Sequence, residues 1–159
     1  MSSEARSIED RLRELGIELP AAVAPIANYV PFVRTGSLLM ISGQLPLDNG
    51  KLPEPFKGKL GKDVFNEAGQ QAARLAGVNV LAQAQVALGD LGRVRRVVRL
   101  GGFINATPGF IALAAVMNGA SDLMVQVFGD RGRHARTTVG VSELPLDAAV
   151  EIDAMLEFE

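Results

Sequence analysis

The reactive side chains of this sequence are carboxylates, arginines, hydroxyls and amides, because thiols are absent and imidazole is nearly so. The chain of 159 residues contains no Cys and a single His, His134. Without Cys it has no thiolate nucleophile, disulfide or Cys-ligated zinc, and one imidazole excludes every two-histidine metal site. We therefore expect no metal and no cofactor, and any reaction must use the remaining polar groups and water.

A cluster of arginines surrounds one expected strand, at Arg93, Arg95, Arg96 and Arg99. Nucleic-acid contacts would require neighbouring aromatic residues for base stacking, and the sequence places none nearby. The 16 Lys and Arg against 18 Asp and Glu give a net charge of −2, whereas dedicated nucleic-acid binders carry a basic excess. We expect a solvated strand face, partly neutralised by the acidic last strand, and no nucleic-acid partner.

His134 stands between Arg133 and Arg136 in the segment Gly-Arg-His-Ala-Arg. Neighbouring cations favour the neutral imidazole, which suits a general base. The sequence provides no evident carboxylate to orient the ring, so a polar residue at the edge of a strand is the favoured alternative. Motifs of phosphate-binding loops, serine hydrolases and zinc proteases are absent from the sequence.

Hydrophobic periodicity predicts the elements that position these groups. We expect a helix at 7–16, a hairpin of strands at 29–34 and 38–42, a helix at 64–88, a strand at 94–104, a helix after Gly109 ending near Phe128, and strands at 134–142 and 150–158. Ser7 and Asp10 have the spacing of a capping box, and Asp63 can cap the second helix. Gly101-Gly102 suggests a bulge or a close backbone approach.

The last strand has the clearest period-two pattern. Its apolar positions are Val150, Ile152, Ala154, Leu156 and Phe158, and its other positions are mostly acidic. Because successive side chains of a strand point to opposite faces, one face belongs to the core and the other is acidic. The element order predicts an α+β domain with helices packed on one face of a mixed sheet.

The length suits one domain with its own core. The first residues are charged throughout, and the longest apolar run, Phe110–Met117, spans eight residues, whereas a membrane helix needs about twenty. We expect a cytoplasmic protein without a membrane partner. The stretch 44–61, rich in Pro and Gly, is predicted to be a long loop, either functional or simply a flexible surface segment.

Two stretches resemble the Rid (reactive intermediate deaminase, YjgF-type) family, also labelled endoribonuclease L-PSP. The first runs from Tyr29 to Pro46 and ends in Ser42-Gly-Gln-Leu-Pro, like the family's opening hairpin. The second reads His134-Ala-Arg136-Thr-Thr-Val-Gly-Val-Ser-Glu-Leu-Pro-Leu-Asp-Ala-Ala-Val-Glu151-Ile-Asp. The resemblance covers about 24–157, so we interpret 1–20 as an N-terminal helical extension and 21–159 as one Rid-like domain.

The resemblance implies a chorismate-mutase-like α+β fold that forms homotrimers with a ligand cleft at each subunit interface. Arg136 matches the family's clamp for the substrate carboxylate, and its planar guanidinium suits a carboxylate. Glu151 matches the glutamate near the attacking water, although on sequence alone it is also an ordinary solvated carboxylate. Tyr29, Ser42 and Asn118 match other positions of the cleft.

The implied reaction is the cofactor-free hydrolysis of a reactive imine or enamine to a 2-oxo acid and ammonia. One alternative is a non-catalytic trimer that binds small carboxylate metabolites in the same cleft. A further alternative is the ribonuclease activity attached to some relatives, which the net charge and the missing His/Lys pair disfavour. The chain departs from the family at His134, Thr137 and Thr138, where Thr138 replaces a small residue of the cleft wall, and in its longer 44–61 loop.

Overall fold

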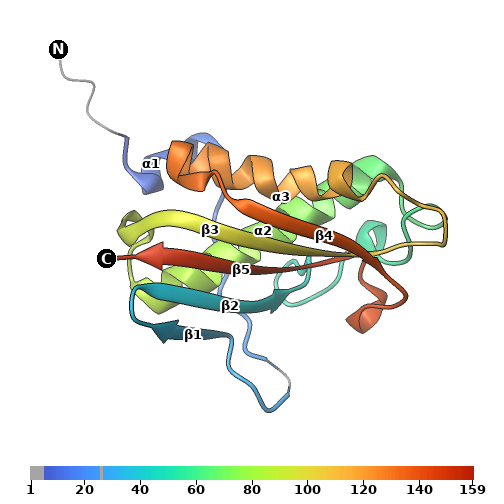
Figure 1. Cartoon of the computed structure of the whole chain (residues 1–159), viewed down its shortest axis with the longest axis horizontal. Coiled ribbons are helices and arrows are strands. Elements are labelled where there is room, and N and C mark those ends of the chain that lie inside the picture. Colours follow the sequence, from blue (N-terminus) through green and yellow to red (C-terminus); the bar gives the residue numbers. More distant parts are fainter. Residues whose placement is uncertain (1–5, 26) are drawn as a thin grey trace.

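Five strands form one mixed sheet in the order β1-β2-β5-β3-β4. The computed structural model describes residues 6–25 and 27–159. The strands are β1 (Phe32–Thr35), β2 (Leu38–Gln44), β3 (Val94–Asn105), β4 (Ala135–Val141) and β5 (Val150–Phe158). β3 and β4 pair in parallel, whereas the other neighbours are antiparallel (Figure 1). A parallel pair needs a long crossover, which α3 provides.

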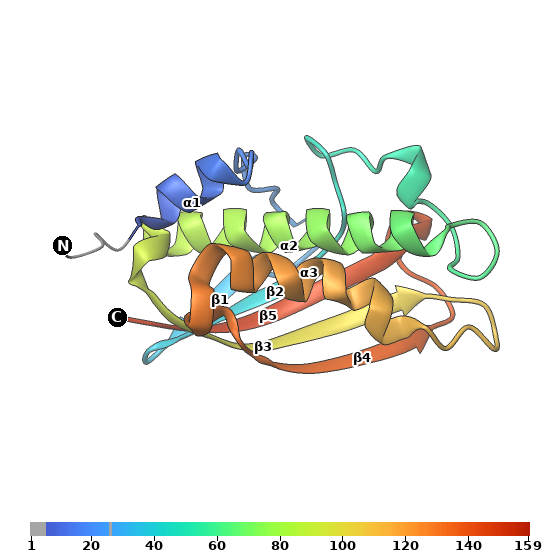
Figure 2. The ribbon, with the colours of Figure 1, turned by 90° about the horizontal axis from the view of Figure 1, so that it is seen from above.

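The helices lie on one side of this sheet. They are α1 (Ile8–Glu14), α2 (Asn66–Leu88) and α3 (Leu113–Phe128), and short 3₁₀ turns occur at Glu54–Phe56, Leu91–Arg93, Gly129–Gly132 and Pro145–Asp147. Figure 2 shows the helices on one face of the sheet and the opposite face uncovered. The predicted α+β architecture is therefore confirmed, with an uncovered sheet face available to other groups.

Small residues allow α2 and α3 to pack closely over the sheet. Ala72, Ala73 and Ala76 of α2 are fully buried. A Cβ atom at Gly77 would lie 3.0 Å from Leu123 of α3, and one at Gly119 would collide with the backbone of α2. α2 ends at Gly89, whose φ of +78° suits glycine.

The predicted cap of α2 by Asp63 is wrong. The helix begins at Asn66, and Phe65 occupies the cap position without a side-chain hydrogen bond. The carboxylate of Asp63 instead accepts a hydrogen bond from the backbone N–H of Lys59 at 3.0 Å. The side chain is thus used to close the tight turn before the helix. In contrast, Ser7 caps α1 as predicted, accepting from the N–H of Asp10 at 3.1 Å.

The alternation of β5 is confirmed along its whole length. Its five apolar positions are buried beneath the helices, and Glu151, Asp153 and Glu157 belong to the uncovered face. β1 begins at Phe32, three residues later than predicted, so Tyr29 lies in the segment before the strand. The bulges of β3 occur near residues 94–99; Gly101 and Gly102 instead leave room for the side chains of Asp153 and Met117.

The arginine cluster is partly neutralised by β5 and the residue that follows it, as expected. Arg95 pairs with Glu159 at 2.5 Å, and Arg99 lies 3.6 Å from Asp153. Arg93 donates to the Glu159 carbonyl and stacks over the ring of Phe158. Within the described residues, no helix is long and apolar enough to span a membrane.

Candidate functional site

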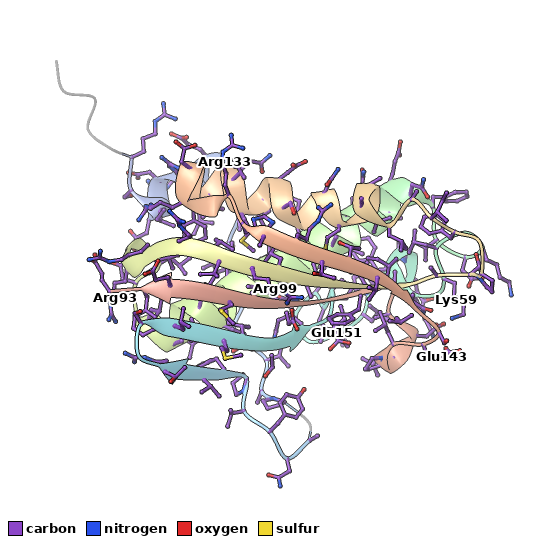
Figure 3. The ribbon with its side chains drawn as sticks, viewed as in Figure 1. Lys59, Arg93, Arg99, Arg133, Glu143 and Glu151 are labelled. Carbon is purple, nitrogen blue, oxygen red and sulfur yellow. The ribbon has the colours of Figure 1, made fainter. Side chains whose placement is uncertain are left out.

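Glu151 lies near the middle of the sheet, on its uncovered face (Figure 3). Its carboxylate lies over Gly43 of the neighbouring strand β2, where any Cβ atom would collide with Oε1. Burial, together with the nearby negative charge of Asp153, raises the pKa of Glu151. A half-buried carboxylate with a raised pKa can exchange a proton with a water or a substrate, as general acid–base catalysis requires.

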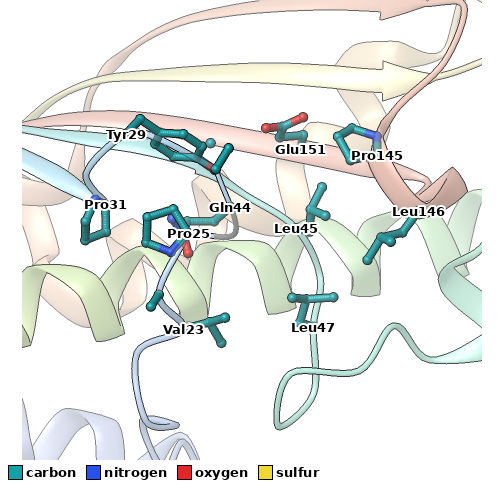
Figure 4. A pocket seen from close by; sticks show the side chains of 13 residues that line it. Val23, Pro25, Tyr29, Pro31, Gln44, Leu45, Leu47, Pro145, Leu146 and Glu151 are labelled. Atoms are coloured by element: carbon teal, nitrogen blue, oxygen red, sulfur yellow. The ribbon is translucent and has the colours of Figure 1, made fainter.

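A cavity of about 350 Å³ opens beside Glu151. Figure 4 shows Glu151 at its edge, with Tyr29 on one side and Leu146 on the other. The cavity is lined by Val23, Ala24, Pro25, Ala27, Tyr29, Pro31, Gly43, Gln44, Leu45, Leu47, Pro145, Leu146 and Glu151. Ser42 is not part of the lining. Its hydroxyl donates to the Val30 carbonyl at 2.7 Å and so fixes the segment that carries Tyr29.

Arg136 on β4 is held against α3 through one end of its guanidinium. Nη1 donates to Asn118 Oδ1 at 2.9 Å and to Ser121 Oγ at 3.0 Å, which uses both of its hydrogens. Nη2 makes one long contact with the Ala114 carbonyl, at 3.5 Å. Among the described residues Nε has no hydrogen-bond partner, so the edge formed by Nε and Nη2 remains available for the two oxygens of a carboxylate.

His134 completes a chain of hydrogen bonds behind this arginine. Its Nδ1 lies 2.6 Å from the Gly132 carbonyl, which can only accept, so Nδ1 carries the proton of the neutral ring. Nε2 then accepts from the hydroxyl of Ser121 at 2.9 Å, and Ser121 accepts from Arg136. The Nε2 lone pair of His134 is occupied by this hydrogen bond. The geometry therefore favours the interpretation of His134 as a polar residue at the strand edge, whose imidazole orients Ser121 and Arg136.

Thr138 follows Arg136 by two positions and therefore faces α3 as well. Its hydroxyl oxygen is buried and has no partner within the described part of the chain. Thr138 thus lies on the same face of β4 as Arg136, and its place in a cleft wall stays a prediction.

The predicted site residues form two groups in one chain. Arg136 pairs in register with the fully buried Leu100 and faces the helices, together with Asn118 and Thr138. Glu151 belongs to the opposite face of the sheet, beside Tyr29. The sequence predicts one cleft for all of these residues, and a single chain does not bring the two groups together.

Two further residues of the candidate site, Ser121 and Gly43, were not predicted from the sequence. Ser121 follows Asn118 by three positions, so the helical spacing alone could have placed both on the face that contacts Arg136. The role of Gly43 depends on a neighbour far away in the sequence and had no local signal. In residues 6–25 and 27–159 no group of three or more His, Asp or Glu side chains could hold a metal ion.

The sheet order and the placement of the helices on one face define an α+β domain of the chorismate-mutase-like class. The family model described as “YjgF/chorismate_mutase-like, putative endoribonuclease” matches residues 9–157. The chain belongs to this YjgF/chorismate mutase-like family, which confirms the resemblance found in the sequence.

Relatives of known sequence and structure cover nearly the whole chain. Protein TCP17 of Trypanosoma cruzi is 50% identical over 147 residues, covering 92% of this chain and 91% of the relative. The crystal structure of Atu1372 from Agrobacterium tumefaciens, a protein of unknown function, has a TM-score of 0.89 at 50% identity and covers 96% and 92% of the two chains. A 2-iminobutanoate/2-iminopropanoate deaminase of Dermatophagoides farinae is 29% identical over 143 residues, covering 90% and 95%.

Proposed function

We propose that this protein hydrolyses 2-imino acids, and the enamines that convert to them, to 2-oxo acids and ammonia. The observation that carries the proposal is the state of Arg136, whose Nη1 is tied to α3 while its Nε and Nη2 edge has room for a carboxylate. The named activity of the mite relative, an imine deaminase, is consistent with this assignment.

The proposed site needs two chains, because Arg136 and Glu151 face opposite sides of one sheet. A cyclic trimer, as the family resemblance implies, would place the Arg136 group of one subunit against the uncovered face that holds Glu151 in the next. Such a head-to-tail interface repeats around a closed ring and completes one cleft for each subunit.

In this cleft the guanidinium of Arg136 binds the carboxylate of the imino acid and fixes its C=N carbon. Glu151 accepts a proton from a water as the water oxygen forms a bond to that carbon, and the C=N bond becomes a C–N single bond. That proton passes from Glu151 to nitrogen and gives a neutral carbinolamine. Glu151 then takes the proton of the carbinolamine hydroxyl and passes it to nitrogen as the C–N bond breaks, so that the carbonyl forms and ammonia leaves. No electrons are transferred, and neither a thiol nor a cofactor takes part.

Subunit complementation tests this proposal. Arg136→Gln and Glu151→Gln variants, each expected to retain about 1% of the wild-type activity or less, are co-expressed with different tags and purified as mixed trimers. Every mixed trimer contains one cleft of three with both intact residues, so the purified mixed trimers should recover about a third of the wild-type activity per subunit. The substrate is an imino acid generated by an amino acid oxidase, and semicarbazide traps whatever imine escapes hydrolysis.

The outcomes separate the candidate functions. Recovery of activity in mixed trimers supports the shared cleft, whereas assembled mixed trimers without activity contradict it. Wild-type protein that accelerates hydrolysis of no imine, yet is stabilised by 2-oxo acids through Arg136, supports the non-catalytic binder instead.

A further inference from the structure

Three polar side chains are buried along the described part of the chain, and all of them hold walls of the cavity beside Glu151. They are Asn79, Gln83 and Asn105, with exposed fractions of 7%, 1% and 0%. Buried amides are retained where their hydrogen bonds are satisfied. In this chain each amide donates to the backbone or side chain of a segment that lines, or directly supports, the cavity.

Two of these amides belong to α2 and hold the segments that carry Val23, Leu45 and Leu47. The amide nitrogen of Gln83 donates to the Val23 carbonyl at 2.9 Å. Asn79 donates to the carbonyls of Leu45 and Leu47, at 2.9 and 3.0 Å. These bonds hold the main chain that carries Val23, Leu45 and Leu47, whose side chains line the cavity (Figure 4).

The third amide supports the wall formed by Leu146. Leu146 and Asp147 both have positive φ angles, 60° and 58°, which is costly for residues other than glycine. Asn105 donates to the Asp147 carboxylate at 3.0 Å and accepts from Lys59 Nζ at 2.7 Å. This network compensates the strain and holds the turn that presents Leu146 to the cavity.

The lining itself is apolar apart from its edge. Among the described residues of the lining, Glu151 is the only charged one, and Tyr29 and Gln44 are the polar ones. The amide of Gln44 donates to the Ser42 carbonyl at 3.0 Å and is thereby partly occupied. The described lining offers no cation of its own for the substrate carboxylate, so with that carboxylate on the adjacent subunit's Arg136 the cavity suits a different part of the substrate.

We infer that this cavity is a preorganised pocket for a large apolar side chain, and that the preferred substrates are imino acids with branched aliphatic or comparable side chains. The inference rests on the proposed function. With the carboxylate on Arg136 of the adjacent subunit and the C=N carbon beside Glu151, the side chain of the substrate extends into the cavity. Its volume of about 350 Å³ far exceeds the need of a methyl group. A charged side chain would lose its hydration there without compensation.

Competition among imines derived from alanine, leucine and glutamate tests the inference. Burial of each added methylene improves transition-state binding by about fourfold. The leucine-derived imine should therefore exceed the alanine-derived one in kcat/KM by at least about tenfold, and the glutamate-derived imine should be the poorest. Affinities of the three corresponding 2-oxo acids, measured by calorimetry, should follow the same order.

A pair of matched variants assigns the selectivity to the cavity. Val23→Phe fills part of the cavity. It should lower the ratio of kcat/KM for the leucine-derived imine to kcat/KM for the alanine-derived imine at least about threefold, because kcat/KM for the leucine-derived imine falls. Val86→Phe makes the same change on an exposed position of α2 outside the lining, and should leave the ratio unchanged. Gln83→Met, which removes the amide and retains the shape, should lower the ratio through a looser wall.

Equal or reversed preference for the alanine-derived imine in an active enzyme overturns the inference and leaves the proposed hydrolysis intact. Selective binding of the leucine-derived oxo acid without turnover of any imine supports the pocket and overturns the hydrolysis. A ratio that Val23→Phe does not change contradicts the placement of the side chain in this cavity.

Discussion

Replacement of Arg136 by lysine examines whether the guanidinium edge, rather than positive charge alone, recognises the substrate. Arg136 is held by Asn118 at 2.9 Å and Ser121 at 3.0 Å, and these bonds leave Nε and Nη2 side by side. Lysine keeps the charge and loses the paired geometry. A charge-assisted hydrogen bond contributes about 1.5–3 kcal/mol, so loss of one bond lowers kcat/KM by about 10- to 100-fold.

Steady-state kinetics with semicarbazide trapping measure this loss, and ligand-induced stabilisation supplies an independent readout. A 2-oxo acid at a hundredfold excess over its Kd stabilises the wild type by about 2.7 kcal/mol, which raises Tm by about 5 °C or more. Arg136→Lys should retain only a fraction of that rise, and Arg136→Gln should lose it.

The matched control is Arg74→Gln, since Arg74 of α2 also donates to a side chain of α3, Gln126 Oε1, at 2.9 Å. Arg74 lies outside both groups of site residues, so its replacement should change neither kcat/KM nor the oxo-acid effect. Wild-type kinetics in the correctly folded Arg136→Lys variant would refute recognition by the guanidinium edge.

Three further outcomes follow from Glu151, Gly43 and Asn105. Because the pKa of Glu151 is raised in the folded state, its carboxylate is harder to ionise there, and the stability of the wild type falls as the pH increases from the ordinary glutamate pKa to the raised one. The Tm of Glu151→Gln should therefore increase relative to that of the wild type across this pH window. The same variant should lower kcat about 100-fold. Gly43→Ala displaces the Glu151 carboxylate and should lower kcat up to about 100-fold, with no added effect in the Glu151→Gln background. Asn105→Leu removes the anchor of the Asp147 turn and should lower the free energy of unfolding by about 2–4 kcal/mol in urea titrations, without a change in m.

The fold could be predicted from local patterns wherever a face of an element was regular. The alternation of β5 and the capping box at Ser7 depend on neighbours within a few residues, and both were predicted correctly. Asp63 was misassigned because a carboxylate near a helix can equally close the preceding turn through Lys59. Spacing alone does not decide between these two uses.

For the candidate site, the sequence could suggest individual residues but not how they are arranged in space. The family resemblance singled out Arg136, Asn118 and Glu151 as candidates, and the structure places the first two in contact. The sequence gives no sign that Glu151 faces the opposite side of the sheet from Arg136, because the sidedness of β4 relative to β5 depends on their pairing with β3. Nor does it indicate which buried amides support which wall.

In the proposed reaction, the distribution of polar groups allows hydrolysis by a chain that has no Cys and whose one His is engaged with Gly132 and Ser121. Imine carbons react readily with water, so the protein needs to position the substrate and transfer protons from water to nitrogen rather than supply a nucleophile. Arg136 is fixed by side chains of α3, and Glu151 is fixed by the space over Gly43. The buried amides donate hydrogen bonds to the segments that carry the apolar walls of the cavity. Recognition, proton transfer and side-chain selection are therefore assigned to separate residues, and each can be changed without removing the other two.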